Sequence, residues 1–116
     1  MRILVVEDEI RISNLLRIYL QRAMFQVDVI NNGKDGLKCA LEEDYNLIIL
    51  DVSMPEMDGY QVLKEVRKIK KTPVIMLSAK CTEEDIKYSK DLGANEFIAK
   101  PFSPGAVITK IKDLLS

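Results

Sequence analysis

The chain has 116 residues, of which 47% are apolar, so it has the size of one domain and enough apolar side chains for a core. The 17 basic and 18 acidic residues give a formal charge of −1, which argues against nucleic acid bound by this domain itself. Histidine is absent, which excludes histidine triads, histidine zinc sites and a phosphohistidine on this chain. The sequence begins directly with a strand pattern and has no apolar stretch of membrane-spanning length, so we expect one soluble, cytoplasmic domain over residues 1–116.

The two cysteines, Cys39 and Cys81, lack metal-ligand spacing and a second pair. Cys39 falls within a helical apolar pattern, which favours a small core residue. Cys81 falls in a polar loop, where we expect a free thiol.

The spacing of apolar residues predicts strands and helices in alternation along the whole chain. In chain order we predict a strand at 2–6, a helix at 9–23, a strand at 25–30, a helix at 34–43, a strand at 46–50, a helix marked by the apolar residues of 62–69, a strand at 74–77, a helix at 82–92, a strand at 97–99 and a helix at 103–115. The second strand alternates apolar with polar residues, which suits the edge of a sheet. Five such pairs with short connections predict an α/β fold, a parallel sheet covered on both faces.

The predicted helix at 82–92 is poor in apolar residues, and Ile86 and Leu92 are its main expected anchors. We expect it to be among the least tightly packed elements, and switching tends to reside in such elements. An ordinary exposed helix is an equally good interpretation of the same pattern.

Acidic side chains follow two of the most apolar runs. Asp51 closes the run 47–50, and Glu7 and Asp8 follow the run 3–6. Ligands bind at the carboxyl edge of open α/β sheets, so three carboxylates converge on one small volume there if the two strands are neighbours.

A cluster of this kind needs a counter-charge. Two unit charges about 4 Å apart repel by roughly 4 kcal/mol at an effective dielectric constant near 20. Either one acid takes up a proton or a cation sits among them, and oxygen ligands on turns suit Mg2+ better than Ca2+. The alternative is that the acids only cap the helices that follow. Ser78 and Lys100 follow the fourth and fifth predicted strands, which adds a hydroxyl and an ammonium group to the same edge.

Four blocks of sequence carry a resemblance that covers essentially all of the chain. They are Val5-Val6-Glu7-Asp8-Glu9, Ile49-Leu50-Asp51-Val52-Ser53-Met54-Pro55-Glu56-Met57-Asp58-Gly59, Pro73-Val74-Ile75-Met76-Leu77-Ser78-Ala79 and Gly93-Ala94-Asn95-Glu96-Phe97-Ile98-Ala99-Lys100-Pro101-Phe102. In this order they resemble the receiver domain of response regulators, the phosphoacceptor half of two-component signalling. The resemblance implies a flavodoxin-like fold, a three-layer α/β/α doubly wound sheet of five parallel strands in the order 2-1-3-4-5.

The resemblance also implies a role for each residue at the edge. Asp51 would accept the phosphoryl group as a nucleophile. Mg2+ would be held by Glu7, Asp8, Asp51 and the backbone carbonyl of Ser53. Lys100 would pair with Asp51 before transfer and with the phosphate after it. Such a chain is a regulatory domain that assists its own phosphorylation and dephosphorylation, and not an enzyme.

The resemblance further implies a switch. The Ser78 hydroxyl would move toward the phosphate, and the aromatic ring of Phe97 would turn inward in response. Backbone N–H groups near Val52 and Ala79 would contact phosphate oxygens, and the Lys100-Pro101 peptide bond would be cis. A plain core aromatic is the alternative interpretation of Phe97.

With no histidine of its own, the chain would receive the phosphoryl group from a sensor histidine kinase, a phosphotransfer protein or a small phosphodonor. The output would be the face formed by 82–115. The start of the chain, 2–8, is most similar to the winged-helix transcription-factor subfamily, which implies a homodimer through that face and an attached or removed DNA-binding domain. Ala106, Lys90 and Asn95 replace a common glutamate, leucine and aspartate, which leaves a stand-alone receiver open.

Three further classes remain as alternatives. A non-phosphorylated interaction module usually loses one or more of the edge residues, which are all present here. A Mg2+-dependent phosphatase usually needs a second acid where Ser53 stands. A flavodoxin-type flavin protein needs a phosphate-binding loop after the first strand, and that loop is acidic in this chain.

Overall fold

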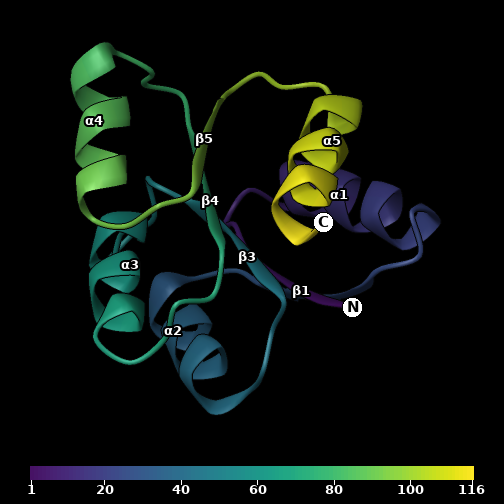
Figure 1. Cartoon of the computed structure of the whole chain (residues 1–116), viewed down its shortest axis with the longest axis horizontal. Coiled ribbons are helices and arrows are strands. Elements are labelled where there is room, and N and C mark those ends of the chain that lie inside the picture. The colour runs from purple at the N-terminus through teal and green to yellow at the C-terminus, as the bar shows by residue number, and fades with distance from the viewer.

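The computed structural model describes all of residues 1–116, with five strands and five helices in alternation (Figure 1). The strands are β1 (Arg2–Val6), β2 (Gln26–Ile30), β3 (Leu47–Asp51), β4 (Val74–Ser78) and β5 (Glu96–Ala99). The helices are α1 (Ile10–Arg22), α2 (Gly33–Glu42), α3 (Gly59–Arg67), α4 (Glu83–Asp91) and α5 (Pro104–Leu115). Every predicted element is present. Ile69, assigned to the third helix by its spacing, lies beyond the end of α3 and is exposed. None of the helices has the length and apolar character needed to cross a membrane.

The five strands form one parallel sheet in the order β2-β1-β3-β4-β5, as the resemblance implied. Helices α1 and α5 lie on one side of the sheet, and α2, α3 and α4 lie on the other (Figure 1). The three-layer α/β/α prediction is therefore confirmed. Strand β2 is an edge strand with no fully buried side chain, which agrees with its alternating sequence.

The central strand β3 is covered on both faces. Leu47 and Ile49 belong to the buried cluster beneath α1 and α5, whereas Ile48 and Leu50 belong to the cluster beneath α2 and α3. Successive side chains of a strand point to opposite faces, so a strand buried on both sides needs apolar residues at every position. Each such side chain contributes about 1.5–3 kcal/mol when it is removed from water.

The carboxyl ends of β3 and β4 extend one residue further than the sequence predicted. Asp51 pairs with Leu77 in the register of the sheet, and Ser78 pairs with Ala99. Both polar residues are therefore the last residues of their strands rather than the first residues of the loops. Their backbone positions are held by sheet pairing, which fixes where their side chains begin.

The predicted helix-start signals are confirmed. The Thr82 side chain accepts from the Asp85 N–H in a capping box at the start of α4. The Ser103 side chain accepts from a backbone N–H of α5, and Pro104 occupies the first position of that helix. Gly93 follows α4 with φ +104°, a conformation that favours glycine.

Helix α4 is weakly packed, as its composition predicted, and its backbone contacts are concentrated on β5. Its expected anchors, Ile86 and Leu92, are only half buried. The one buried residue of the helix is Ser89, a polar residue whose burial no apolar pattern indicated.

The two cysteines are both free thiols. Cys39 is half buried and packs against the cluster beneath α2 and α3, and Cys81 is exposed. Both positions agree with the predictions.

Two helical glycines provide a test of the packing. A Cβ on Gly36 would lie 2.6 and 2.8 Å from the γ-carbons of buried Val6, whereas a Cβ on Gly105 would meet no atom within 4 Å. We expect Gly105→Ala to raise the free energy of unfolding by about 0.5–1 kcal/mol, because alanine favours helix. We expect Gly36→Ala to lower it by about 1–3 kcal/mol through overpacking. Urea denaturation of the two variants measures both effects, and a shift of the same sign in both would contradict this view of the α2–β1 contact.

Candidate functional site

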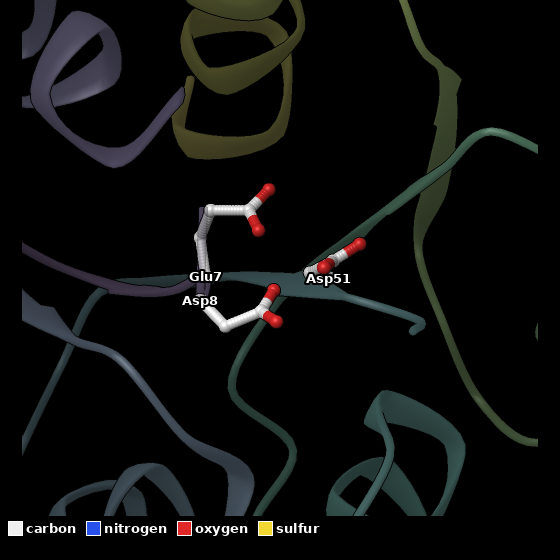
Figure 2. A group of neighbouring side chains, drawn as sticks. All are labelled: Glu7, Asp8 and Asp51. Carbon is white, nitrogen blue, oxygen red and sulfur yellow. The ribbon is translucent and has the colours of Figure 1, made fainter. Parts of the chain in front are cut away.

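Three carboxylates converge at the carboxyl edge of the sheet. Glu7 and Asp8 follow β1 directly, and Asp51 ends β3. Strands β1 and β3 are neighbours, with Val6 opposite Leu50, so the next residues along each strand lie side by side. Each acid offers an oxygen within 4.8 Å of the others, and Figure 2 shows the three side chains grouped in one place. The predicted convergence is confirmed.

Lys100 joins two of these acids. Its Nζ lies 2.8 Å from Glu7 Oε1 and 3.0 Å from Asp51 Oδ1. The backbone N–H of Lys100 donates to the carbonyl of Ser78 at 2.8 Å, which extends the pairing of β4 and β5 to this residue. Its peptide bond to Pro101 is cis, as the resemblance implied. The resemblance implied the pairing with Asp51, but the contact with Glu7 was not predicted.

Burial sets the protonation of this cluster. It raises the pKa of Glu7 to about 7, a shift that neighbouring Asp51 reinforces and Lys100 opposes. Burial also raises the pKa of Asp51, again against the effect of Lys100. For Lys100 burial favours the neutral amine, but the contacts with the carboxylates of Glu7 and Asp51 outweigh burial and raise its pKa. One ammonium group therefore serves two carboxylates that are poorly solvated, and Asp8 adds a third acid.

Glu7 is the most deeply placed of the acids and has no exposed surface. Its Oε2 accepts from the Glu9 N–H at 3.1 Å, just before α1. Its Oε1 has no partner with hydrogen-bond geometry, although the ammonium group of Lys100 lies 2.8 Å from it. The capping alternative therefore describes one oxygen of Glu7 and does not account for the other, which retains lone pairs for a further ligand.

Capping does not account for Asp51 either. Helix α3, which follows it, is capped by Asp58 in a capping box with Gln61. The carboxylate of Asp51 is left to contact Lys100 at the edge of the sheet.

A cavity of about 610 Å³ lies between the loops that follow β3 and β4, and its lining includes Val52, the residue after Asp51 in the chain. Ser53 and Ser78 line it, as expected for residues of this edge. Ser78 is buried, and its hydroxyl accepts from the Lys80 N–H at 3.0 Å. The N–H of Val52 donates to the Leu77 carbonyl at 2.9 Å, and the contact of nearby backbone N–H groups with a phosphate oxygen stays a prediction.

The structure brings further side chains to this cavity that sequence patterns did not single out. Tyr60 and Asp85 both line it, from the first turns of α3 and α4. The only signal for Tyr60 was an aromatic residue directly after the turn glycine Gly59.

Phe97 lies apart from the carboxylates. It occupies β5 opposite Met76, is half buried, and packs against the cluster beneath α2 and α3. In this position it is a core-packed aromatic ring, and its role in a switch stays a prediction.

Residues 3–112 match the family described as response regulator receiver domain. The chain belongs to this family. Its identity to the transcriptional regulatory protein SrrA of Staphylococcus aureus is 44% over 113 residues, which cover 97% of this chain and 47% of SrrA. The receiver thus spans about half the length of the curated relatives that it matches.

Solved structures agree with this assignment. The receiver domain of a Francisella response regulator is similar with a TM-score of 0.94 and 30% identity, over 98% of this chain and 95% of that one. The response regulator TrrA of Thermotoga maritima, in complex with Mg2+-BeF, is similar with a TM-score of 0.88 and 36% identity, over 98% of both chains. The expected fold and the receiver assignment are confirmed.

The buried acid predicts how the stability of the receiver depends on pH when a chelator removes divalent ions. The pKa of Glu7 is about 7 in the folded chain against a reference of 4.5, so the folded state binds more protons between these values. Stability then falls as the pH rises through this range. We expect Glu7→Gln to flatten that fall and to raise the free energy of unfolding at neutral pH by about 1–3 kcal/mol.

Urea denaturation at a series of pH values with a chelator measures this effect. Exposed Glu9→Gln is the matched control, for which we expect the wild-type pH profile. A Glu7→Gln profile as steep as that of the wild type would contradict the assigned cause.

Proposed function

We propose that the receiver accepts a phosphoryl group on Asp51 with the help of Mg2+, and that residues 1–116 act as one such domain. The observation that carries the proposal is the group of three carboxylates that Lys100 only partly neutralises. The carboxylate of Asp51 would attack phosphorus, and the bond from phosphorus to the donor would break, so that the electron pair leaves with the donor.

The residues present fit a magnesium ion. Carboxylate oxygens are the ligands of a hard cation, and Glu7 Oε1 has no hydrogen-bond partner. Glu7, Asp8, Asp51 and the backbone carbonyl of Ser53 would hold the ion. Once bound, it would supply positive charge to the oxygens of the transferring group.

The other edge residues would orient the phosphoryl group. The Nζ of Lys100 lies 3.0 Å from Asp51 Oδ1. After transfer it would contact the phosphate in place of the carboxylate. The hydroxyl of Ser78, which accepts from the Lys80 N–H, would donate its proton to a phosphate oxygen. Phe97 would fill space vacated by that movement.

The donor has to be another molecule because the chain has no histidine. We propose a sensor histidine kinase or phosphotransfer protein as the partner, in the cytoplasm. The receiver would act as a regulatory domain whose own residues assist phosphorylation and dephosphorylation, and not as an enzyme with a turnover substrate.

The output is proposed to be the face formed by 82–115, with transcription as its target through a DNA-binding domain. The relative SrrA, named a transcriptional regulatory protein, and the similarity to the winged-helix subfamily support this output. A homodimer through this face is weaker as a proposal. On that face Lys110 pairs with Glu96 at 3.1 Å, and Asn95 accepts from the Val74 N–H inside the chain. A stand-alone receiver and a non-phosphorylated module are the alternatives.

The acceptor is tested by intact mass after incubation with Mg2+ and acetyl phosphate. We expect one added phosphoryl group on the wild type, and none on Asp51→Asn or without the metal ion, because Asp51 is the acid of the cluster whose next residues, Val52 and Ser53, line the cavity. Asp58→Asn, at the same loop but engaged in capping α3, is the control that keeps the modification. Phosphate on Asp51→Asn would assign the acceptor to another residue.

The role of Lys100 is tested by Lys100→Ala. Removing one partner of a buried ion pair costs about 3–5 kcal/mol, so we expect a large loss of stability in a chelator. We expect Mg2+ to bind the variant and to restore part of this stability, because the ion replaces the missing positive charge. Urea denaturation with and without Mg2+ measures both, with exposed Lys90→Ala as the control. A variant that no longer responds to Mg2+ would show that Lys100 organises the metal site itself.

A further inference from the structure

Helix α4 is fixed to the rest of the molecule at its carboxyl end. Arg67 of α3 donates to the Gly93 carbonyl at 2.9 Å and to Asn95 Oδ1 at 3.1 Å. Asn95 in turn accepts from the Val74 N–H of β4 at 2.9 Å. At the other end, residues 82–85 hydrogen-bond with one another in the capping box. The start of α4 is therefore less constrained than its end, and Figure 1 shows the helix at the periphery beside α3.

One further contact holds the middle of α4 against α3, and we call it the α3–α4 contact. The rings of Tyr60 and Tyr88 pack edge to face, with centroids 4.8 Å apart and planes at 80°. The Ser89 hydroxyl lies 3.4 Å from the Tyr60 hydroxyl and donates to the Asp85 carbonyl at 3.0 Å. Ser89 is the one buried residue of α4, so this contact lies where the helix is closest to the core.

The backbone next to Tyr60 is attached to the end of the strand that carries Asp51. The preceding residue, Gly59, donates its N–H to the Val52 carbonyl at 2.8 Å. A Cβ on Gly59 would lie 2.2 Å from the Asp51 carbonyl oxygen, so the two backbones are in direct contact. Tyr60 also lines the cavity whose wall includes Val52 and Ser53, the residues that follow Asp51, and Lys80 of the loop before α4 lines the same cavity.

We propose that the α3–α4 contact opposes entry of a phosphoryl group into this cavity, which makes Tyr60 a positioning residue that couples the site to α4. The inference rests on the proposed function. Ser78 accepts from the Lys80 N–H, and a hydroxyl that turns toward a phosphoryl oxygen weakens this link to the loop 79–82. The start of α4 then shifts about its fixed end at Gly93, while Tyr60 stays with β3 and loses its partners.

Binding in the cavity and the α3–α4 contact affect each other by the same free energy. The direction of the effect can therefore be measured by changing either one. If filling the cavity has to break the α3–α4 contact, removing the contact beforehand strengthens binding in the cavity. It also loosens α4 in the unliganded receiver. A contact that only stabilises the fold loosens α4 without changing binding.

The experiment uses Tyr88→Leu, which removes the ring pair on the exposed side of α4, and Tyr60→Phe, which keeps the ring and removes the hydroxyl. Tyr19→Leu on α1 is the matched control, because α1 lies across the sheet from α3 and α4 and Tyr19 is similarly exposed. Two quantities are measured for each variant. They are amide hydrogen exchange of residues 83–91 without ligand, and the beryllofluoride concentration that half-saturates the receiver at fixed Mg2+.

For Tyr88→Leu we expect roughly fivefold faster exchange of the α4 amides and roughly fivefold tighter beryllofluoride binding, with smaller changes of the same sign for Tyr60→Phe. Wild-type values are expected for the control. Faster exchange with unchanged beryllofluoride binding would overturn the inference, as would unchanged exchange. A wild-type receiver that binds no beryllofluoride would overturn the proposed function itself, and this outcome is separate because it appears before any variant is compared.

Discussion

The double contact of Lys100 with Glu7 and Asp51 is the interaction on which the site depends. Two poorly solvated carboxylates lie side by side because β1 and β3 are neighbours, and each would be unstable as an anion without a positive charge close by. The ammonium group comes from the end of β5, two strands away from Asp51. The contact at 2.8 and 3.0 Å therefore forms only if the whole strand order is correct.

Close backbone contacts hold the loop that follows Asp51 in place beside the acids. Gly59 packs its backbone against the Asp51 carbonyl, and a Cβ on Gly33 of α2 would lie 2.1 Å from the Met57 carbonyl. The loop between β3 and α3 is thereby held from two sides. Glu56 within it has φ 68°, a conformation that costs an ordinary residue roughly 1–2 kcal/mol. Sheet pairing and close backbone contacts keep this loop in place, and a divalent ion would find its ligands already arranged.

The alternation of strands and helices and the positions of the edge residues could be predicted because both follow from local patterns, whereas the strand order came from the family resemblance. Apolar runs without alternation mark buried parallel strands, and the residue after each run lies at the carboxyl edge, so Asp51 and Ser78 were placed to within one residue. Side-chain contacts between distant segments leave no such pattern. The contact of Lys100 with Glu7 spans 93 positions of the chain, and burial of Ser89 depends on Tyr60, 29 positions earlier. Composition identified α4 as weakly packed but could not show what holds it.

The weak packing of α4 sets how much free energy is needed to move this helix. A helix held by a large apolar face moves only at a high free-energy cost, since each buried apolar side chain contributes about 1.5–3 kcal/mol. Helix α4 buries only Ser89. It is held by one ring pair, one hydroxyl contact, the half-buried Ile86 and Leu92, and the Arg67 hydrogen bonds at its end. Attachments of this size are comparable with the coupling free energies of about 1–3 kcal/mol that ligands exert between sites. Under the proposed function, a phosphoryl group on Asp51 would therefore be able to shift this helix, whereas α1 and α5, which bury several apolar side chains, would stay in place.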